Sequence, residues 1–229
     1  MDRWYRRYAA DEMPDVHYCL SFAHEPGVLH TKSKIETLSD LRGTRVRPAN
    51  STVSRFLTSF GAIPINLAAG ETRDALDKGV ADAITFPWAT VLNFGLDKSL
   101  KYHLDVPLYT STTAILMNKR RYEGLSDNVR AAVDAMCTPS AARKIGAGWA
   151  AKEKAGKPEL SARPGHLVYD LAPSELQKWR AGVRPLEHAW YERVARRGVD
   201  GPKALANLRA ELRKVGAAYD ASAPQLKKE

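Results

Sequence analysis

The fold is decided by a stretch that begins "TRVRPANSTVSRFLTSFGAIPINL", residues 44–67. The run "TRVRP" predicts a strand that Pro48 ends, and residues 50–61 predict a helix, because their apolar side chains fall on one face at helical spacing. A strand, a short helix and a further strand follow at 63–67, 69–79 and 80–86. Such alternation favours a sheet with parallel strands and helical crossovers, so we predict an α/β fold.

The sequence outside this stretch predicts further elements, enough for one large domain or two small ones. The expected strands lie at 16–22 and 166–171, with two extended stretches over 101–119. The expected helices lie at 2–10, 125–137, 139–155, 174–198 and 202–219, with Pro185 interrupting the fourth. No run of about 20 apolar residues occurs, so nothing in the sequence predicts a membrane span.

The charge of the chain is positive and unevenly distributed. The net charge is +9, and most of the excess lies in residues 120–229. These lysines and arginines are spread through amphipathic helices, which favours a solvated helix face or attraction of a small anion over nucleic-acid binding. We therefore expect no nucleic-acid partner, while a basic nucleic-acid-interaction module in this part of the chain stays open as an alternative.

The two cysteines, Cys19 and Cys137, lie in apolar surroundings and form no CxxC motif. Buried cysteine often behaves as a small apolar residue, so we expect two buried free thiols. A disulfide between them is the alternative.

Motifs that would carry catalysis are missing from the sequence. The six histidines are scattered without the spacing of metal ligands, and neither a phosphate-binding loop nor a nucleophile elbow is present. We therefore expect a protein that is not an enzyme and that holds no metal and no cofactor. An enzyme on a similar α/β scaffold, with His30 or His103 as base, is the alternative.

Arg45 and Arg47 are two residues apart, so in a strand they point to the same face. A helix begins immediately afterwards at Asn50, and its first turn has free backbone N–H groups. A guanidinium beside a helix N-terminus suits a planar carboxylate. The alternative is that Arg47 forms an internal salt bridge and Asn50 only caps the helix. The residues by themselves leave both interpretations open.

Three longer segments resemble the substrate-binding proteins of TRAP transporters, the DctP family. They are "VLHTKSKIETLSDLRGTRVRPANST", "FGAIPINLAAGETRDALDKGVADAITFPW" and "ILMNKRRYEGLSDNVRAAVD", residues 28–52, 60–88 and 115–134. The resemblance covers about 100 residues, and its features occur in the family's order. It implies a two-lobed periplasmic binding protein that closes over an organic acid and hands it to the membrane subunits of a sodium-driven permease.

The resemblance also implies which residues touch the ligand. Arg47 takes the place of the arginine that clamps the substrate carboxylate, next to Asn50 at the start of the helix. Phe86 stands where many members have an asparagine that touches the ligand, and Trp88 follows it closely. Ala69 stands where an aromatic residue is common.

The departures from the family pattern predict the kind of acid. Gly27 replaces a second arginine that sialic-acid-binding members carry, and Phe86 replaces an amide. Losing these hydrogen-bonding groups and gaining apolar walls favours a monocarboxylate with an aromatic or apolar body over a sugar acid. Plain core packing is the alternative role for Phe86 and Trp88.

Members of this family are longer than the present chain, so the resemblance implies a protein that lacks the N-terminal third. The N-terminus "MDRWYRRYAADEM" has no apolar region and no small-residue cleavage site, so the chain as written has no signal peptide, although the family is periplasmic. On this basis residues 1–24 and 114–153 would be a remnant of lobe I with a connecting helix. Residues 25–113 and 154–229 would form lobe II, the carboxylate-binding lobe.

Overall fold

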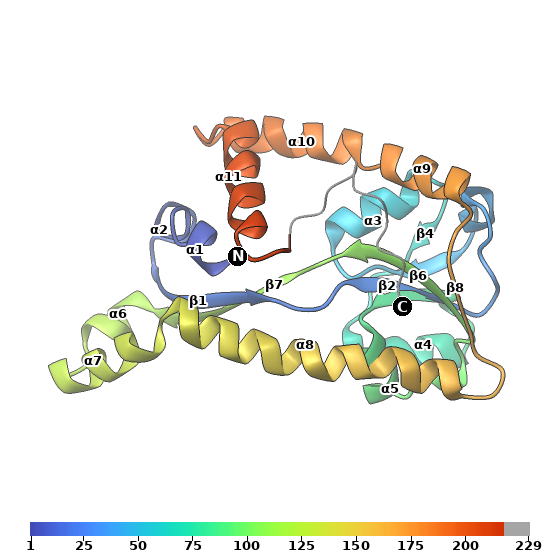
Figure 1. Cartoon of the computed structure of the whole chain (residues 1–229), viewed down its shortest axis with the longest axis horizontal. Helices are drawn as coiled ribbons and strands as arrows, with labels where there is room; N and C mark the ends of the chain where they lie inside the picture. The colour runs from blue at the N-terminus through green and yellow to red at the C-terminus, as the bar shows by residue number, and fades with distance from the viewer. Residues whose placement is uncertain (218–229) are drawn as a thin grey trace. The chain divides into compact units, whose positions relative to one another are not determined.

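A computed structural model of the chain describes residues 1–217, which fall into two compact units (Figure 1). Unit 1 comprises Met1–Phe22, Ala114–Ala142 and the described residues from Trp190 onward, 190–217. Unit 2 comprises Ala23–Thr113 and Arg143–Ala189. Each unit is described separately below.

Unit 2 is built on a six-stranded sheet with the order β4-β3-β5-β2-β6-β8. The strands are β2 (Gly27–Thr31), β3 (Arg45–Arg47), β4 (Ile63–Pro64), β5 (Ala83–Phe86), β6 (Tyr102–Tyr109) and β8 (Leu167–Tyr169). Strand β3 is parallel to β4 and to β5, and β6 is parallel to β8, whereas β2 is antiparallel to both of its neighbours. The predicted α/β fold with parallel strands is therefore confirmed, and its sheet is mixed.

Helices cover both faces of this sheet (Figure 1). On one face lie the short helix η1 (Leu38–Leu41), α3 (Ser51–Thr58) and α9 (Pro173–Ala181). On the other lie α4 (Thr72–Asp77), α5 (Trp88–Asn93) and most of α8 (Pro139–Ala162). The short helices η2 (Ala69–Glu71) and η3 (Leu96–Lys98) complete this unit. Residues alternate between the two cores: Leu29 of β2 packs toward α3, and its neighbour Val28 packs toward α4.

Local sequence signals account for where these elements begin and end. Asn50 caps α3, since its side-chain oxygen accepts hydrogen bonds from the backbone N–H groups of Thr52 and Val53, both at 3.0 Å. After α3, Gly61 adopts a left-handed backbone with φ 89°, which glycine tolerates at no steric cost. Thr37 and Asp40 form a capping box around η1.

Unit 1 joins a two-stranded sheet, β1 (Val16–Ala23) with β7 (Thr112–Asn118), to short helices. The helices are α1 (Asp2–Tyr5), α2 (Ala9–Glu12), α6 (Lys119–Glu123), α7 (Asp127–Met136), α11 (Gly201–Arg213) and the end of α10 (Arg184–Ala195). Cys19 of β1 and Cys137 form a disulfide. The expectation of two free thiols is therefore wrong, because the fold brings together cysteines that are 118 residues apart in sequence.

Three predicted helices differ from the observed ones. The single helix expected over 2–10 is two short helices, because the chain turns between Tyr5 and Ala9. The helix expected to end near 155 continues through Pro158 to Ala162, and Leu160 in this last turn is fully buried. The last helix ends at Arg213, and positions 218–219 of its expected range lie outside the described residues.

The compact units group the C-terminal residues differently from the predicted lobes. Residues 190–217 cluster with the N-terminus, where the indole N–H of Trp4 donates to the carbonyl of Ala204 at 2.9 Å. The assignment of either unit to a lobe stays a prediction. Within the described residues, no helix is long and apolar enough to cross a membrane.

Candidate functional site

Strand β3 presents its two arginines on one face of the unit 2 sheet, because Val46 between them is buried on the opposite face. Arg45 is already paired: its Nε and Nη2 donate to the two carboxylate oxygens of Asp82 at 2.8 and 2.7 Å. Arg45 is therefore neutralised by a surface ion pair and is not available to bind an anion. The site must be sought at Arg47.

Arg47 is a half-buried cation that forms no ion pair with a carboxylate of the described residues. Its Nε donates to the backbone carbonyl of Leu67 at 3.3 Å, and its guanidinium carbon lies 4.7 Å from the centre of the Phe86 ring. Burial lowers the pKa of Arg47, with a smaller opposing effect from Tyr109, but an arginine stays protonated at any physiological pH. Its terminal nitrogens are thus available to a planar anion.

Phe86 reaches Arg47 because of the sheet register. Val46 pairs with Ala83 and Arg47 with Ile84 in the parallel ladder, so Phe86 projects on the same face as Arg47, one pleat further along. The Phe86 side chain is 7% exposed and stacks on Phe94 with ring centres 5.8 Å apart. An aromatic face therefore borders the guanidinium.

Tyr109, at the end of β6, is a site residue that the sequence did not reveal. Its hydroxyl donates to the carbonyl of Thr85 at 3.2 Å, and burial raises its pKa, so it stays a neutral phenol near Arg47. The Tyr109 ring packs edge-on against His24 at 5.7 Å. Only its position shortly after Pro107 in an extended stretch could have drawn attention to it, since its pairing with Gly27 is a register that the structure alone shows.

Of the other predicted site residues, two lie in the apolar cluster of Phe86 and one lies apart from it. Ala69 and Trp88 belong to the same apolar cluster as Phe86. The Trp88 ring faces His30 at 5.4 Å in an edge-on contact and is 7% exposed. Asn50 is exposed, and its oxygen is engaged in capping α3.

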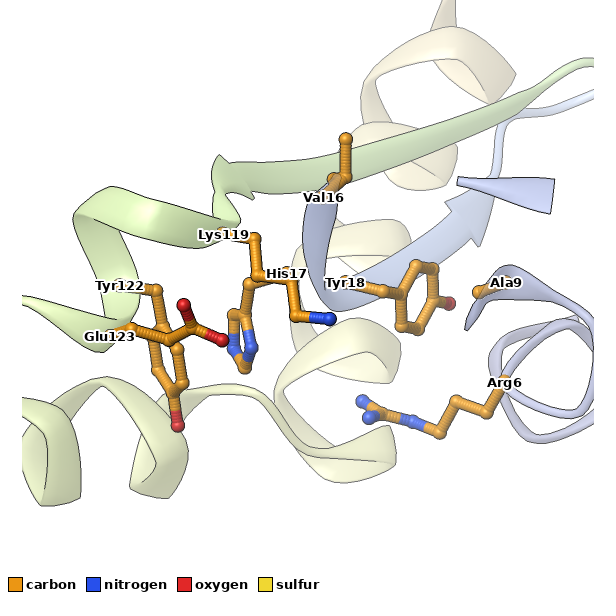
Figure 2. A pocket seen from close by; sticks show the side chains of 8 residues that line it. All are labelled: Arg6, Ala9, Val16, His17, Tyr18, Lys119, Tyr122 and Glu123. Atoms are coloured by element: carbon orange, nitrogen blue, oxygen red, sulfur yellow. The ribbon is translucent and has the colours of Figure 1, made fainter. Parts of the chain in front are cut away.

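A separate cavity of about 370 Å³ lies in unit 1 (Figure 2). Its lining residues are Arg6, Ala9, Val16, His17, Tyr18, Lys119, Tyr122 and Glu123. The Arg6 guanidinium is committed to Asp2 and to the carbonyls of Cys19 and Cys137, and Lys119 is solvent-exposed. The lining of this cavity therefore offers a carboxylate no half-buried cation free of an ion pair, whereas Arg47 is such a cation within the described residues. In the described part of the chain, no group of three or more His, Cys, Asp or Glu residues is placed to hold a metal ion.

Comparisons with known proteins agree with the fold described above. Residues 9–193 match the family model for bacterial extracellular solute-binding protein, family 7, also called DctP. The outer membrane transporter protein TsaT of Comamonas testosteroni is 25% identical over 211 residues, which are 88% of this chain and 60% of that protein. The chain therefore spans less than two thirds of the length of this curated relative.

Two solved structures are more similar still. A TRAP periplasmic solute-binding protein of Bordetella bronchiseptica, with (R)- and (S)-mandelate bound, is 27% identical with a TM-score of 0.85, covering 93% of this chain and 69% of that one. A TRAP solute-binding protein of Rhodoferax ferrireducens T118, in complex with copurified benzoate, is 30% identical with a TM-score of 0.84, covering 94% and 69%. The chain thus has the mixed α/β architecture of the two-lobed periplasmic binding proteins, and it belongs to family 7 of the bacterial extracellular solute-binding proteins, the DctP family.

Proposed function

We propose that this chain captures a small organic monocarboxylate with an aromatic or apolar body for a TRAP transporter, and that Arg47 clamps the carboxylate. The observation that carries the proposal is the state of Arg47. A half-buried guanidinium without an ion pair among the described residues lies against the ring of Phe86 and close to Tyr109. A carboxylate that completes this arrangement gains two parallel charge-assisted hydrogen bonds.

The surroundings of Arg47 favour an aromatic acid over a hydroxyl-rich one. Phe86, with Ala69 and Trp88 in the same cluster, supplies apolar wall rather than hydrogen-bonding groups. Mandelate and benzoate, which the two similar solved proteins hold, are both monocarboxylates with an aromatic ring. Asn50, at the start of α3, would add the favourable field of a helix N-terminus.

The same proposal covers the partners, the compartment and the domain roles. The partners would be a small organic acid and the membrane subunits of a TRAP permease, and the chain would bind without chemical conversion. The Cys19–Cys137 disulfide supports an oxidising compartment such as the periplasm. Unit 2, which holds Arg47, would be the carboxylate-binding lobe.

Thermal unfolding in the presence of benzoate, mandelate and a sugar acid tests this proposal. Ligand that binds only the folded state stabilises it by about 2.7 kcal/mol at 100 times its Kd, so benzoate or mandelate should raise Tm and the sugar acid should not. Arg47→Lys should lose most of the benzoate shift, because an ammonium cannot form the paired hydrogen bonds. Arg45→Lys, on the same strand face but bound to Asp82, is the matched control and should keep it. A wild-type protein that no aromatic acid stabilises, or an Arg47→Lys variant with wild-type affinity, would contradict the proposal.

A further inference from the structure

Three histidines of unit 2 form one hydrogen-bonded chain that ends at Phe86. The Nε2 of His30 lies 3.1 Å from the carbonyl oxygen of Phe86, and the Nδ1 atoms of His30 and His103 are 2.8 Å apart. His103 Nε2 lies 2.8 Å from Nδ1 of His166, whose own Nε2 lies 3.1 Å from the Nζ of Lys101. The chain therefore runs from a partly exposed lysine to the strand end beside Arg47.

The two ends of the chain determine the direction of every bond in it. The Phe86 carbonyl can only accept, so His30 carries its proton on Nε2, and its Nδ1 accepts from Nδ1–H of His103. The free Nε2 of His103 then accepts from Nδ1–H of His166. The remaining nitrogen of His166 accepts from the Lys101 ammonium, which can only donate. One set of tautomers satisfies all four bonds.

The imidazoles of His30, His103 and His166 are all neutral near pH 7. Burial lowers the pKa of His30 to about 4. Burial, followed by the neighbouring His30, His166 and Lys101, lowers the pKa of His103 as well. The pKa of His166 is lowered by its burial and by Lys101, against an opposing effect of Asp97.

Charged groups on the neighbouring elements leave this neutrality intact. Arg163, directly after the end of α8, is paired with Asp97 and also lowers the pKa of His166. Lys157 of α8 and Asp105 of β6 form an ion pair, and Lys157 lies over the Trp88 ring, which itself contacts His30 and His103. Glu153 of α8 is engaged with the backbone N–H groups at the start of α5.

The strand end that receives this chain is held by side chains rather than by the sheet ladder alone. Two successive carbonyls of β5 are bonded in this way: that of Thr85 accepts from the Tyr109 hydroxyl, and that of Phe86 accepts from His30. Pro87 follows, so the backbone offers no N–H to continue the pairing. The position of the Phe86 ring therefore depends on side chains contributed by β2 and β6.

We infer that His30 is a positioning residue of the candidate site, locked in one tautomer by the chain His103–His166–Lys101, and that it fixes the Phe86 carbonyl and thereby the ring against Arg47. In its link to a ligand this inference rests on the proposed function. The hydrogen-bonded series of histidines does not rest on the proposed function, because it is defined by contacts within unit 2.

Histidine tautomers are read directly from long-range ¹⁵N–¹H NMR spectra of the ¹⁵N-labelled protein, with no ligand present. At about pH 7.5, where all three rings are neutral, His30 should carry its proton on Nε2, and His103 and His166 on Nδ1. A His30 ring protonated on Nδ1, or rings that exchange between tautomers, would overturn the chain whatever the protein binds.

Benzoate titrations of variants at His166, two hydrogen bonds away from His30, test whether the histidines affect ligand binding. His166→Phe removes the donor to His103 without touching His30, and it should weaken benzoate binding about tenfold, the cost of one lost buried hydrogen bond. His166→Asn retains an N–H donor and should recover most of the affinity. His188→Ala, an exposed histidine of α10, is the control.

The outcomes separate the two claims. If His166→Phe binds benzoate as tightly as His188→Ala does, the positioning role is wrong although the proposed function stands. If the wild-type protein binds neither benzoate nor mandelate nor another aromatic acid, the proposed function fails and the role in ligand binding fails with it, even where the tautomers are as stated.

Discussion

Gly27 lies directly beneath the ring of Tyr109, so closely that a Cβ atom at position 27 would be 2.1 Å from the ring atom Cε1. The space that a side chain at position 27 would occupy is thus filled by an aromatic ring from β6. The group that lies over Gly27 near Arg47 is therefore a neutral phenol, because burial raises the pKa of Tyr109.

Gly27→Ala should therefore be destabilising although alanine is small. Real Cβ atoms do not approach a ring carbon so closely, and overpacking costs about 1–3 kcal/mol. Gly27→Ala combined with Tyr109→Ala should recover part of this loss, because the clash is removed, and a double-mutant cycle by urea unfolding measures that coupling. Gly70→Ala, where nothing lies within 4 Å of the added atom, is the control. Additive effects of the two substitutions would show that the ring and the glycine are not in contact.

Phe86→Leu should distinguish the contribution of the aromatic ring to ligand binding from the contribution of apolar packing to stability. The exchange keeps an apolar side chain of similar size and should cost less than about 1.5 kcal/mol of stability. It removes the ring that faces the Arg47 guanidinium at 4.7 Å, so benzoate binding should weaken by about threefold to tenfold. Calorimetric titration of the variant and the wild-type protein checks this. Unchanged benzoate affinity would mean that Phe86 serves only as core.

Asn50→Asp should distinguish capping from ligand binding. Aspartate caps as well as asparagine does, so the free energy of unfolding should change by less than about 0.5 kcal/mol, whereas Asn50→Ala should cost about 1 kcal/mol. The added negative charge near the start of α3 should nevertheless weaken binding of a carboxylate at Arg47. The measurement is a benzoate titration at low salt, where charge effects are least screened. Wild-type affinity in Asn50→Asp would place the ligand away from this helix end.

Reduction of the Cys19–Cys137 disulfide should destabilise unit 1. The bond closes a loop with a sequence separation of 118, and loss of a crosslink of that kind costs about 2–5 kcal/mol. Urea unfolding of Cys19→Ser/Cys137→Ser, followed by the tyrosine and tryptophan signals, checks this. Added dithiothreitol should lower the stability of the wild-type protein to that of the double variant and should leave the variant unchanged. A wild-type protein that is insensitive to the reductant would contradict the bond.

Stability should fall with pH from about 6.5 downward, before the carboxylates titrate. The pKa of His30 in the folded state is about 4, below its ordinary value of 6.5, so the unfolded chain binds more protons in this window. Above about pH 6.5, His30 therefore makes the free energy of unfolding neither rise nor fall with pH. As the pH is lowered below about 6.5, His30 reduces the free energy of unfolding by up to about 1.4 kcal/mol per pH unit.

Urea unfolding at pH values between about 7.5 and 5 measures this slope for the wild-type protein. The lowered pKa values of Asp82 and Glu211 also favour the folded state, but their contributions are lost only as the pH falls below about 4.5. The window above about pH 5 thus isolates the histidines. A flat profile there would mean that the buried imidazoles take up protons as readily in the folded protein as in the unfolded chain.

The sequence by itself determined the elements whose signals are local. The alternation over residues 44–86 and the start of a helix at Asn50 depend on residues a few positions apart, and the structure confirms them. The family, too, could be named from ordered motifs along the chain. The placement of Arg47 beside Phe86 was expected only from that resemblance.

The tertiary structure decided the contacts that join distant segments. Hydrogen bonding in the β3–β5 ladder, rather than any sequence pattern, sets Phe86 beside Arg47, and the same sheet places Tyr109 over Gly27. The disulfide and the chain of three histidines were not predictable for the same reason. Their members are scattered polar or thiol residues, and no periodicity within a strand or helix reports which of them will meet across a folded sheet.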